Sequence, residues 1–243
     1  MRRSLLAILF AMSFSFALLQ ADVTISYSIK RSVDGTPADG GRVMFVKGPR
    51  LRIDDTIGGK TSTRIIDLRS GLAIELDDEA MRAITMRLSR CAADVSDSVP
   101  PDRTEVEVRP SQLRREIRGQ SCGGYDLVLS RRDAKANARA WATRDAPGAA
   151  EYVAFWKDAA SGCLPIEEFD PDHPASAENI MITEAFRRIA ENGGMPYECV
   201  MTLTVSTAGK DLVREYVWRL TDVSCAPIRD DAFAVPSSYA STR

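Results

Sequence analysis

The chain has 243 residues, of which 44% are hydrophobic and 27% are charged, and its formal net charge is −2 at pH 7. Basic and acidic residues are interspersed along the whole chain, whereas a nucleic-acid-binding domain concentrates positive charge on one face. The length suits one domain with a sizeable core or two small domains. Composition therefore favours a globular protein and argues against a nucleic-acid partner.

The first 21 residues have the pattern of a cleavable bacterial export signal. Arg2 and Arg3 precede a mostly apolar, uncharged run, and Ala21 is a small residue at the expected cleavage point. The run is short for a membrane span, which needs about 20 apolar residues. We expect a signal peptide over residues 1–21, a mature chain over 22–243, and a periplasmic or secreted location without a permanent membrane span. An uncut N-terminal anchor is the alternative.

Cysteine content fits an oxidising compartment, where thiols at this density usually form disulfides. The number is odd, so one thiol stays free or pairs between chains. No two cysteines are spaced as a CxxC redox motif. A bridge between Cys91 and Cys122, which flank a loop and a pair of strands, is the first choice among pairings that the sequence leaves open. The disulfide candidates are Cys91, Cys122, Cys163, Cys199 and Cys225.

Period-two alternation dominates the first half of the mature chain and indicates half-buried antiparallel strands. Turn signals such as Gly48-Pro49 and Gly58-Gly59 separate these strands about every ten residues. The segment SVDGTPADGG is interpreted as a turn-rich connection, and residues 89–104 as a loop. Strands are predicted at residues 23–30, 42–47, 50–54, 61–68, 72–76, 84–88, 106–108, 113–118, 125–129 and 137–143.

The periodicity becomes helical in the middle of the chain. Over residues 149–160 the apolar positions form one stripe, which predicts a helix packed on the core. Ser176 is a suitable N-cap for a second helix, and Gly193-Gly194 is a suitable end for it. These two helices make a predicted insertion at about 149–193. The two stripes are Tyr152, Phe155, Trp156 and Ala159, then Ile182, Ala185, Phe186 and Ile189.

The last third returns to strands with clear alternation, which predicts a hairpin over residues 197–205 and 212–221. Many antiparallel strands with two late helices exclude an all-parallel sheet. A long meander must curl or be covered to hide its apolar face and its edges. The predicted fold class is α+β and mainly antiparallel β. It is a single domain, a curved, half-open β-barrel covered by two helices on its concave side.

Several segments carry a family resemblance. They are GRVMFVKGPRLRIDD, TSTRIIDLRSGLAIELDDEAMRAITM, IRGQSCGGYDL, GGMPYECVMTLTV and DDAFAVPSSY. Together they resemble a family of bacterial exported proteins known as a domain of unknown function, which is similar to the periplasmic lipoprotein carriers of the LolA/LolB type. The resemblance implies an unclosed β-barrel that holds acyl chains, and it supplies no catalytic residues. The five cysteines are not part of the pattern.

Catalytic signatures are weak in this sequence. His173, the single histidine, lies among acidic residues and prolines, without an HExxH or GxSxG motif beside it. Neighbouring carboxylates at Asp54-Asp55, Asp77-Asp78-Glu79, Glu167-Glu168 and Asp230-Asp231 lie in or beside predicted turns, where Asp bonds the local backbone. A glycosidase-like carboxylate pair stays open. We therefore expect no enzyme, no metal and no cofactor.

Aromatic and methionine side chains either fill the core or line an apolar cavity, since Met adapts to promiscuous apolar sites. The sequence favours a non-catalytic exported protein that binds a lipid, an acyl chain or another apolar ligand in a half-barrel. The alternative is an envelope or secreted interaction or structural protein with a filled core and no ligand. The expected ligand-lining residues are Met86, Phe155, Trp156, Phe186, Met201, Leu203, Trp218 and Leu220.

Overall fold

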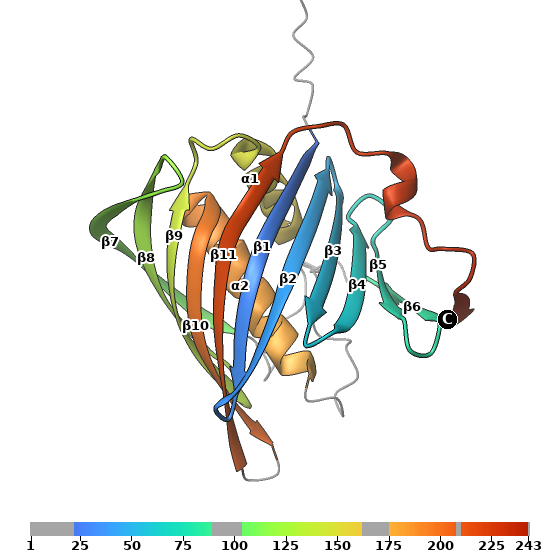
Figure 1. The fold of residues 1–243 in the computed structure, drawn as a ribbon, viewed down its shortest axis with the longest axis horizontal. Coiled ribbons are helices and arrows are strands. Elements are labelled where there is room, and N and C mark those ends of the chain that lie inside the picture. The colour runs from blue at the N-terminus through green and yellow to red at the C-terminus, as the bar shows by residue number, and fades with distance from the viewer. Residues whose placement is uncertain (1–21, 89–103, 162–174, 208–209, 243) are drawn as a thin grey trace, which may run out of the picture.

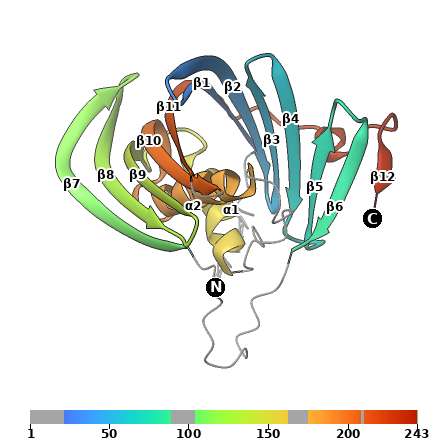
Figure 2. The same cartoon turned by 90° about the horizontal axis from the view of Figure 1, so that it is seen from below.

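A computed structural model describes residues 22–88, 104–161, 175–207 and 210–242. One 12-stranded sheet runs through these residues in the order β12-β6-β5-β4-β3-β2-β1-β11-β10-β9-β8-β7. The sheet curves around α1 (Ala149–Ser161) and α2 (Ala175–Gly193), as Figures 1 and 2 show. The strands are β1 Val23–Val33, β2 Thr36–Lys47, β3 Arg50–Ile57, β4 Lys60–Asp67, β5 Leu72–Asp77, β6 Arg82–Arg87, β7 Glu105–Ile117, β8 Gln120–Ser130, β9 Ala134–Thr143, β10 Met195–Thr207, β11 Lys210–Ser224 and β12 Ala240–Thr242.

Strands β1 to β6 form an antiparallel meander whose first turn is tighter than the sequence suggested. Asp34 and Gly35 both have positive φ, at 48° and 83°, as a two-residue hairpin turn requires. The predicted connection over SVDGTPADGG is too long, because β2 already begins at Thr36. Gly40 lies inside β2, where a Cβ would be 2.0 Å from the Thr56 carbonyl oxygen of β3. Glycine here permits a close approach of two strands instead of a turn.

Strands β7 to β9 form a second meander, and β10 and β11 form the predicted hairpin. β7 is one strand, not the two expected, because a register shift between Pro110 and Arg114 bends it without breaking it. β11 also pairs with β1, so the first strand and the second-last strand meet in the middle of the sheet. The sheet stays open, with β7 and β12 at its opposite ends (Figure 2).

Both predicted helices are present between β9 and β10, and their apolar stripes are buried. α2 ends at Gly193, and the next residue, Gly194, has a positive φ of 100° and donates its N–H to the carbonyls of Ile189 and Ala190. The concave sides of β8, β9 and β10 pack against α2, and α1 contacts β2 and β10. The prediction of a mainly antiparallel, curved, half-open barrel covered by two helices is confirmed.

The C-terminal segment covers part of the convex face and was not predicted from the sequence. A 3₁₀ helix at Asp230–Phe233 places Phe233 and Ile228 against Ile65 of β4. The guanidinium of Arg50 lies 4.7 Å from the Phe233 ring centroid. Beyond it, β12 pairs in parallel with β6. Three residues are too few to show alternation, which is why β12 gave no signal.

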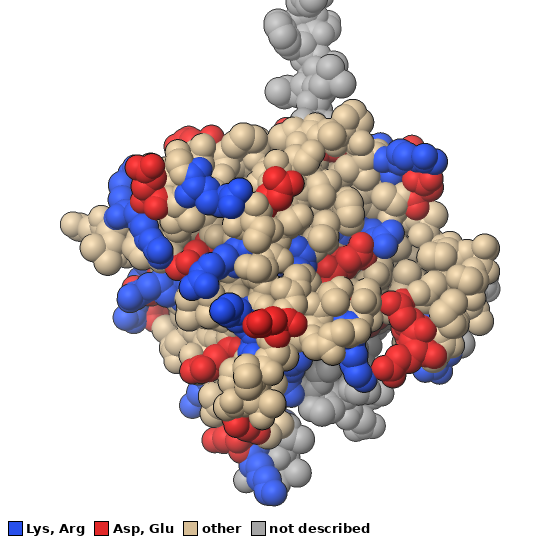
Figure 3. Space-filling view, in the orientation of Figure 1, with Lys and Arg blue, Asp and Glu red and all other residues tan. Residues whose placement is uncertain are grey.

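Residues 1–21 lie outside the described residues, so the signal peptide and the division into 1–21 and 22–243 stay predictions. In the described part of the chain, neither helix has the length and apolarity to cross a membrane. Figure 3 shows Lys and Arg side chains interspersed with Asp and Glu over one face of the molecule.

Gly40→Ala tests the close approach of β2 and β3. The added methyl group would overlap the Thr56 carbonyl, so we expect the free energy of unfolding to fall by about 1–3 kcal/mol in urea denaturation. Gly41→Ala is the matched control, because a Cβ at Gly41 would meet only the Tyr27 carbonyl at 3.4 Å. It should change stability by less than about 1 kcal/mol. Equal effects at the two positions would contradict this account.

Candidate functional site

The concave face gathers all the residues that the sequence proposed as ligand-lining. Met86 comes from β6, Phe155 and Trp156 from α1, Phe186 from α2, and the others from the β10–β11 hairpin. Met86 is partly buried, and the other seven side chains are at most 6% exposed. All belong to, or pack against, one hydrophobic cluster. The structure therefore brings these residues together, while their contact with a ligand remains a proposal.

Three buried aromatic rings cross this face in a continuous row, which we call the aromatic row: Phe186, Trp218 and Tyr216. Phe186 meets Trp218 edge-on at 5.4 Å between centroids, and Trp218 stacks on Tyr216 at 4.9 Å. Each end of the row carries a guanidinium, with Arg42 5.6 Å from Phe186 and Arg31 5.7 Å from Tyr216. Both distances lie within the range of cation–π attraction.

Arg42 forms a largely buried ion pair with Asp55, its neighbour across β2 and β3. The guanidinium donates two hydrogen bonds to the carboxylate, at 2.7 and 2.8 Å, in the bidentate geometry that arginine favours. Burial lowers the pKa of Arg42, but Asp55 raises it more, so the net change is upward. Arg42 therefore stays charged while it lies against Phe186.

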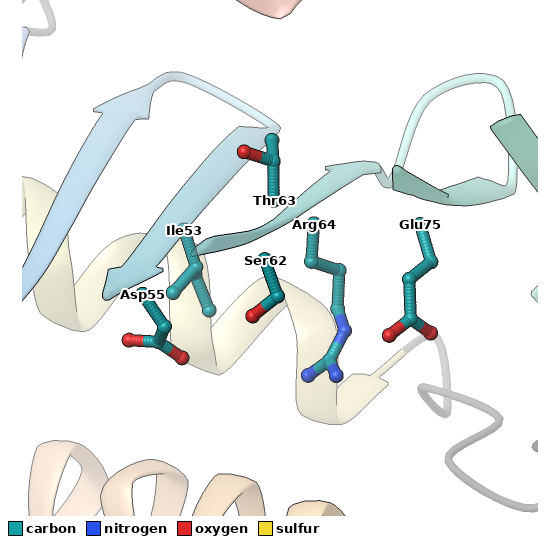
Figure 4. Close-up of a pocket in the computed structure, with 6 residues that line it drawn as sticks. All are labelled: Ile53, Asp55, Ser62, Thr63, Arg64 and Glu75. Carbon is teal, nitrogen blue, oxygen red and sulfur yellow. The ribbon is translucent and has the colours of Figure 1, made fainter. Parts of the chain in front are cut away.

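A small polar pocket lies next to this ion pair, on β3, β4 and β5 (Figure 4). Asp55, Ser62, Arg64 and Glu75 point to the same side of the sheet, and Thr63 points to the other. Burial lowers the pKa of Arg64, while Glu75 and then Asp55 oppose that effect. The cavity volume of about 10 Å³ has room for about one water molecule. It is far too small for an acyl chain.

A second charged group, the Glu178 group, consists of Glu178 on α2, Arg31 on β1 and Arg214 on β11. Arg31 Nη2 lies 3.3 Å from Glu178 Oε1, and Arg214 contacts the other carboxylate oxygen. Burial raises the pKa of the Glu178 carboxyl to about 7, although Arg31 acts in the opposite direction. The group attaches the first turn of α2 to the concave face at the end of the aromatic row.

The concave face is not equally buried everywhere. On β6, Met86 lies opposite Ala73 of β5 and packs against the main core cluster, and Ile84 shares its side of the strand. Ile84 is 41% exposed and Met86 is partly buried, in contrast to the fully buried residues beneath α2. Apolar surface that reaches solvent on the concave face is thus found at β6.

The structure shows the positions of three of the five cysteines. Cys122 and Cys199 are buried, and burial raises the pKa of their thiols to about 11 and about 12. Cys225 is exposed, and all three are free thiols. The expected bridge from Cys91 to Cys122 is therefore absent from the structure. Cys91 and Cys163 lie outside the described residues, so their pairing stays a prediction.

Most of the carboxylates considered as catalytic candidates have local structural partners. Asp54 accepts hydrogen bonds from Arg52 and Thr63, and Asp77 accepts one from the backbone N–H of Ala80. His173 and the pair Glu167-Glu168 lie outside the described residues. Among the residues that the structure describes, no three His, Cys, Asp or Glu side chains form a group that could hold a metal ion.

Sequence reasoning missed the inward-pointing arginines, although a signal for them exists. Arg31 lies two residues after Ile29 and four after Tyr27, so it shares the buried side of β1. Arg42 lies two residues before Met44, so it shares the buried side of β2. A charged residue in an apolar phase is unusual, because burial of an unpaired charge is costly. Such positions mark buried ion pairs or ligand-binding sites.

Comparison with known proteins gives likenesses of fold only. No family model matches the chain, and no curated protein matches its sequence. An uncharacterized conserved protein from Thermus thermophilus is 8% identical with a TM-score of 0.46, covering 93% of this chain and 91% of that one. A DUF1329 family protein from Desulfovibrio piger is 8% identical with a TM-score of 0.31, covering 88% and 90%. A putative outer membrane lipoprotein-sorting protein domain from Vibrio parahaemolyticus is 7% identical with a TM-score of 0.29, covering 88% and 89%.

The structural neighbours thus include a protein of a domain-of-unknown-function family and a lipoprotein-sorting domain. These are the two kinds of protein that the sequence resembles. All three TM-scores are below 0.5, so the likenesses say nothing about ligands or partners. The function must rest on the residues of this chain.

Thiol alkylation will test the burial of the cysteines. At pH 8, Cys225 should react within minutes in the native protein, whereas Cys122 and Cys199 should react only after denaturation, because burial keeps them protonated. Mass mapping of labelled peptides gives the rates, and Cys225→Ser should abolish the fast native labelling among these three. Native labelling of Cys199 as fast as that of Cys225 would show that the core opens readily.

Arg42→Met will test the ion pair beneath the helices. It leaves the Asp55 carboxylate largely buried without its partner, so we expect a loss of about 3 kcal/mol in the free energy of unfolding. Arg139→Met is the matched control, since its pair with Asp126 is exposed and should be worth less than about 1 kcal/mol. The double variant Arg42→Met/Asp55→Leu should recover part of the loss. No recovery would mean that Arg42 acts through packing alone.

Proposed function

We propose that this protein is a non-catalytic exported binding protein that holds a lipid, an acyl chain or another apolar ligand on the concave face of its half-open barrel. It would act in the periplasm or after secretion. The observation that carries the proposal is the exposed apolar surface at β6. There, Ile84 and Met86 continue the buried concave face to solvent.

The exposed apolar side chains of β6 favour an apolar ligand. A ligand that covers Ile84 and Met86 gains about 0.8 kcal/mol for each CH₂ group removed from water. Methionine is unbranched and flexible, so its side chain can follow ligands of different shape. The open sheet leaves β6 near one end, where a ligand does not have to pass between paired strands.

The carboxylates support a binding role over a catalytic one. Asp55 is held by Arg42, and Asp54 by Arg52 and Thr63. A general acid or base needs a proton-transfer group within reach of a substrate, and these groups are engaged with arginine or hydroxyl partners. Of the two, Asp55 lies on the concave side of the sheet, whereas Asp54 bonds Thr63 on the convex side.

The second candidate function is an envelope interaction or structural protein with a filled core. One observation favours it. Seven of the eight residues expected to line a cavity are at most 6% exposed, in a cluster that also contains the helix stripes. Leu203 and Trp218 in particular lie fully buried, where loss of a side chain normally destabilises the core by about 2–5 kcal/mol.

Ile84→Asp will distinguish these functions. If β6 contacts the ligand, the new charge should weaken binding of the apolar fluorescent probe N-phenyl-1-naphthylamine by at least about tenfold, with little change in unfolding midpoint. Val128→Asp is the matched control, because Val128 is 43% exposed at an outward position of β8 between the buried Leu127 and Leu129. It should leave probe binding unchanged.

Native mass spectrometry of protein purified from its own host complements the probe. A co-purifying lipid that is lost from the Ile84→Asp variant but kept by Val128→Asp would support the binding function. A wild-type protein that binds no probe and carries no lipid would instead favour the filled-core interaction protein.

A further inference from the structure

Four buried donor atoms on the neighbouring strands β1 and β11 have no hydrogen-bond partners in the described part of the chain. They are Arg31 Nε, Arg214 Nε, Tyr216 Oη and Trp218 Nε1. Arg31 and Tyr216 lie directly opposite each other on β1 and β11. Arg214, Tyr216 and Trp218 alternate along β11 and therefore share its concave face. Tyr216 and Trp218 are each only 1% exposed.

Unpartnered buried donors are rare in native proteins, because each loses its hydrogen bonds to water on folding. An arginine or an indole N–H can only donate, and a tyrosine hydroxyl can donate as well as accept. Each of the four atoms is therefore suited to an acceptor oxygen.

The positive charges beside these atoms also favour a partner with negatively charged oxygens. Two guanidinium groups, on Arg31 and Arg214, face a single carboxylate on Glu178. The side chains of Arg214 and Glu178 are 11% and 10% exposed, so water screens this excess of positive charge weakly. The Asp34 carboxylate also acts on Arg214, but its Oδ1 accepts the backbone N–H of Val213. The two guanidinium groups thus exceed the one carboxylate that contacts them.

We propose that Arg31, Arg214, Tyr216 and Trp218 form an oxyanion site that takes the carboxylate or phosphate head group of an amphipathic ligand. Planar guanidinium groups fit such oxyanions with paired hydrogen bonds. Arg31 is 25% exposed and gives access from solvent, while the aromatic row leads from the site into the apolar core. That the ligand is amphipathic depends on the proposed function, whereas binding of a free oxyanion would depend only on the four residues of the site.

The test compares two ligands that differ only in the head group, decanoate and 1-decanol, by isothermal titration calorimetry at pH 8. Wild-type protein should bind decanoate at least about tenfold more tightly than decanol, as expected for hydrogen bonds to a charged group. Arg214→Gln should remove this preference without changing decanol affinity. Arg219→Gln is the matched control on the same strand, because Arg219 is exposed and bonded to Glu198. It should keep the preference.

A second variant covers the case in which Arg214→Gln does not fold. Glu178→Gln removes the carboxylate that occupies the arginines, so it should raise decanoate affinity several-fold and leave decanol affinity unchanged. Inorganic phosphate alone forms the third arm, read as a rise in unfolding midpoint. A rise that Arg214→Gln abolishes, together with no preference for decanoate, would assign the site to a free oxyanion.

Failure of the site and failure of the proposed function give different results. Equal binding of decanoate and decanol, with no stabilisation by phosphate, would overturn the oxyanion site while leaving an apolar binding function in place. Binding of neither amphiphile, with stabilisation by phosphate through Arg214, would overturn the apolar function and keep the site. A decanoate preference that survives both Arg214→Gln and Glu178→Gln unchanged would also overturn the site.

Discussion

Pairing of β1 with β11 is the constraint on which the rest of the structure depends. The ladder runs from Thr24 opposite Ser224 to Val33 opposite Arg214. In the described part of the chain it is the strand pairing that joins β1–β6 to β7–β11, and contacts of the helices with β1 and β2 add to it. It places Arg31 opposite Tyr216 and completes the curved surface on which the helices lie. Such a pairing of distant segments costs much chain entropy, so it is expected to form late in folding.

Sequence patterns predicted the faces of the strands and the two helices but not the partners of the strands. Alternation in Tyr197 to Val205 shows which side chains are buried, yet the same alternation is compatible with any neighbouring strand. Gly40 resembles a turn residue in the sequence because glycine favours turns, whereas its role depends on a carbonyl of β3 that the sequence does not reveal. The buried arginines were hidden for a similar reason. Arg42 looks like a surface residue until Asp55 and Phe186 are placed beside it.

The concave face combines features that usually exclude each other. It has fully buried aromatic rings, guanidinium groups at both ends of the aromatic row, and partly exposed apolar side chains at β6. The charged groups cost free energy to bury, so they are kept where ion pairs and ring contacts offset that cost. In a binding protein this arrangement separates two tasks: the apolar surface supplies affinity, and the fixed charges supply orientation and choice of head group.

The two ends of the sheet differ in how their backbone is protected. At one end β12, which belongs to the C-terminal segment, occupies the hydrogen-bonding side of β6, and Tyr239 bonds Asp78 beside it. At the other end β7 carries Pro110, a change of register and alternating charges, all of which disfavour docking of a further strand. An open barrel exposes two strand edges where a closed one exposes none. In this chain the edge beside the apolar surface of β6 is the one covered by a strand. Under the proposed function, an acyl chain on β6 and a foreign β-strand would therefore not compete for the same place.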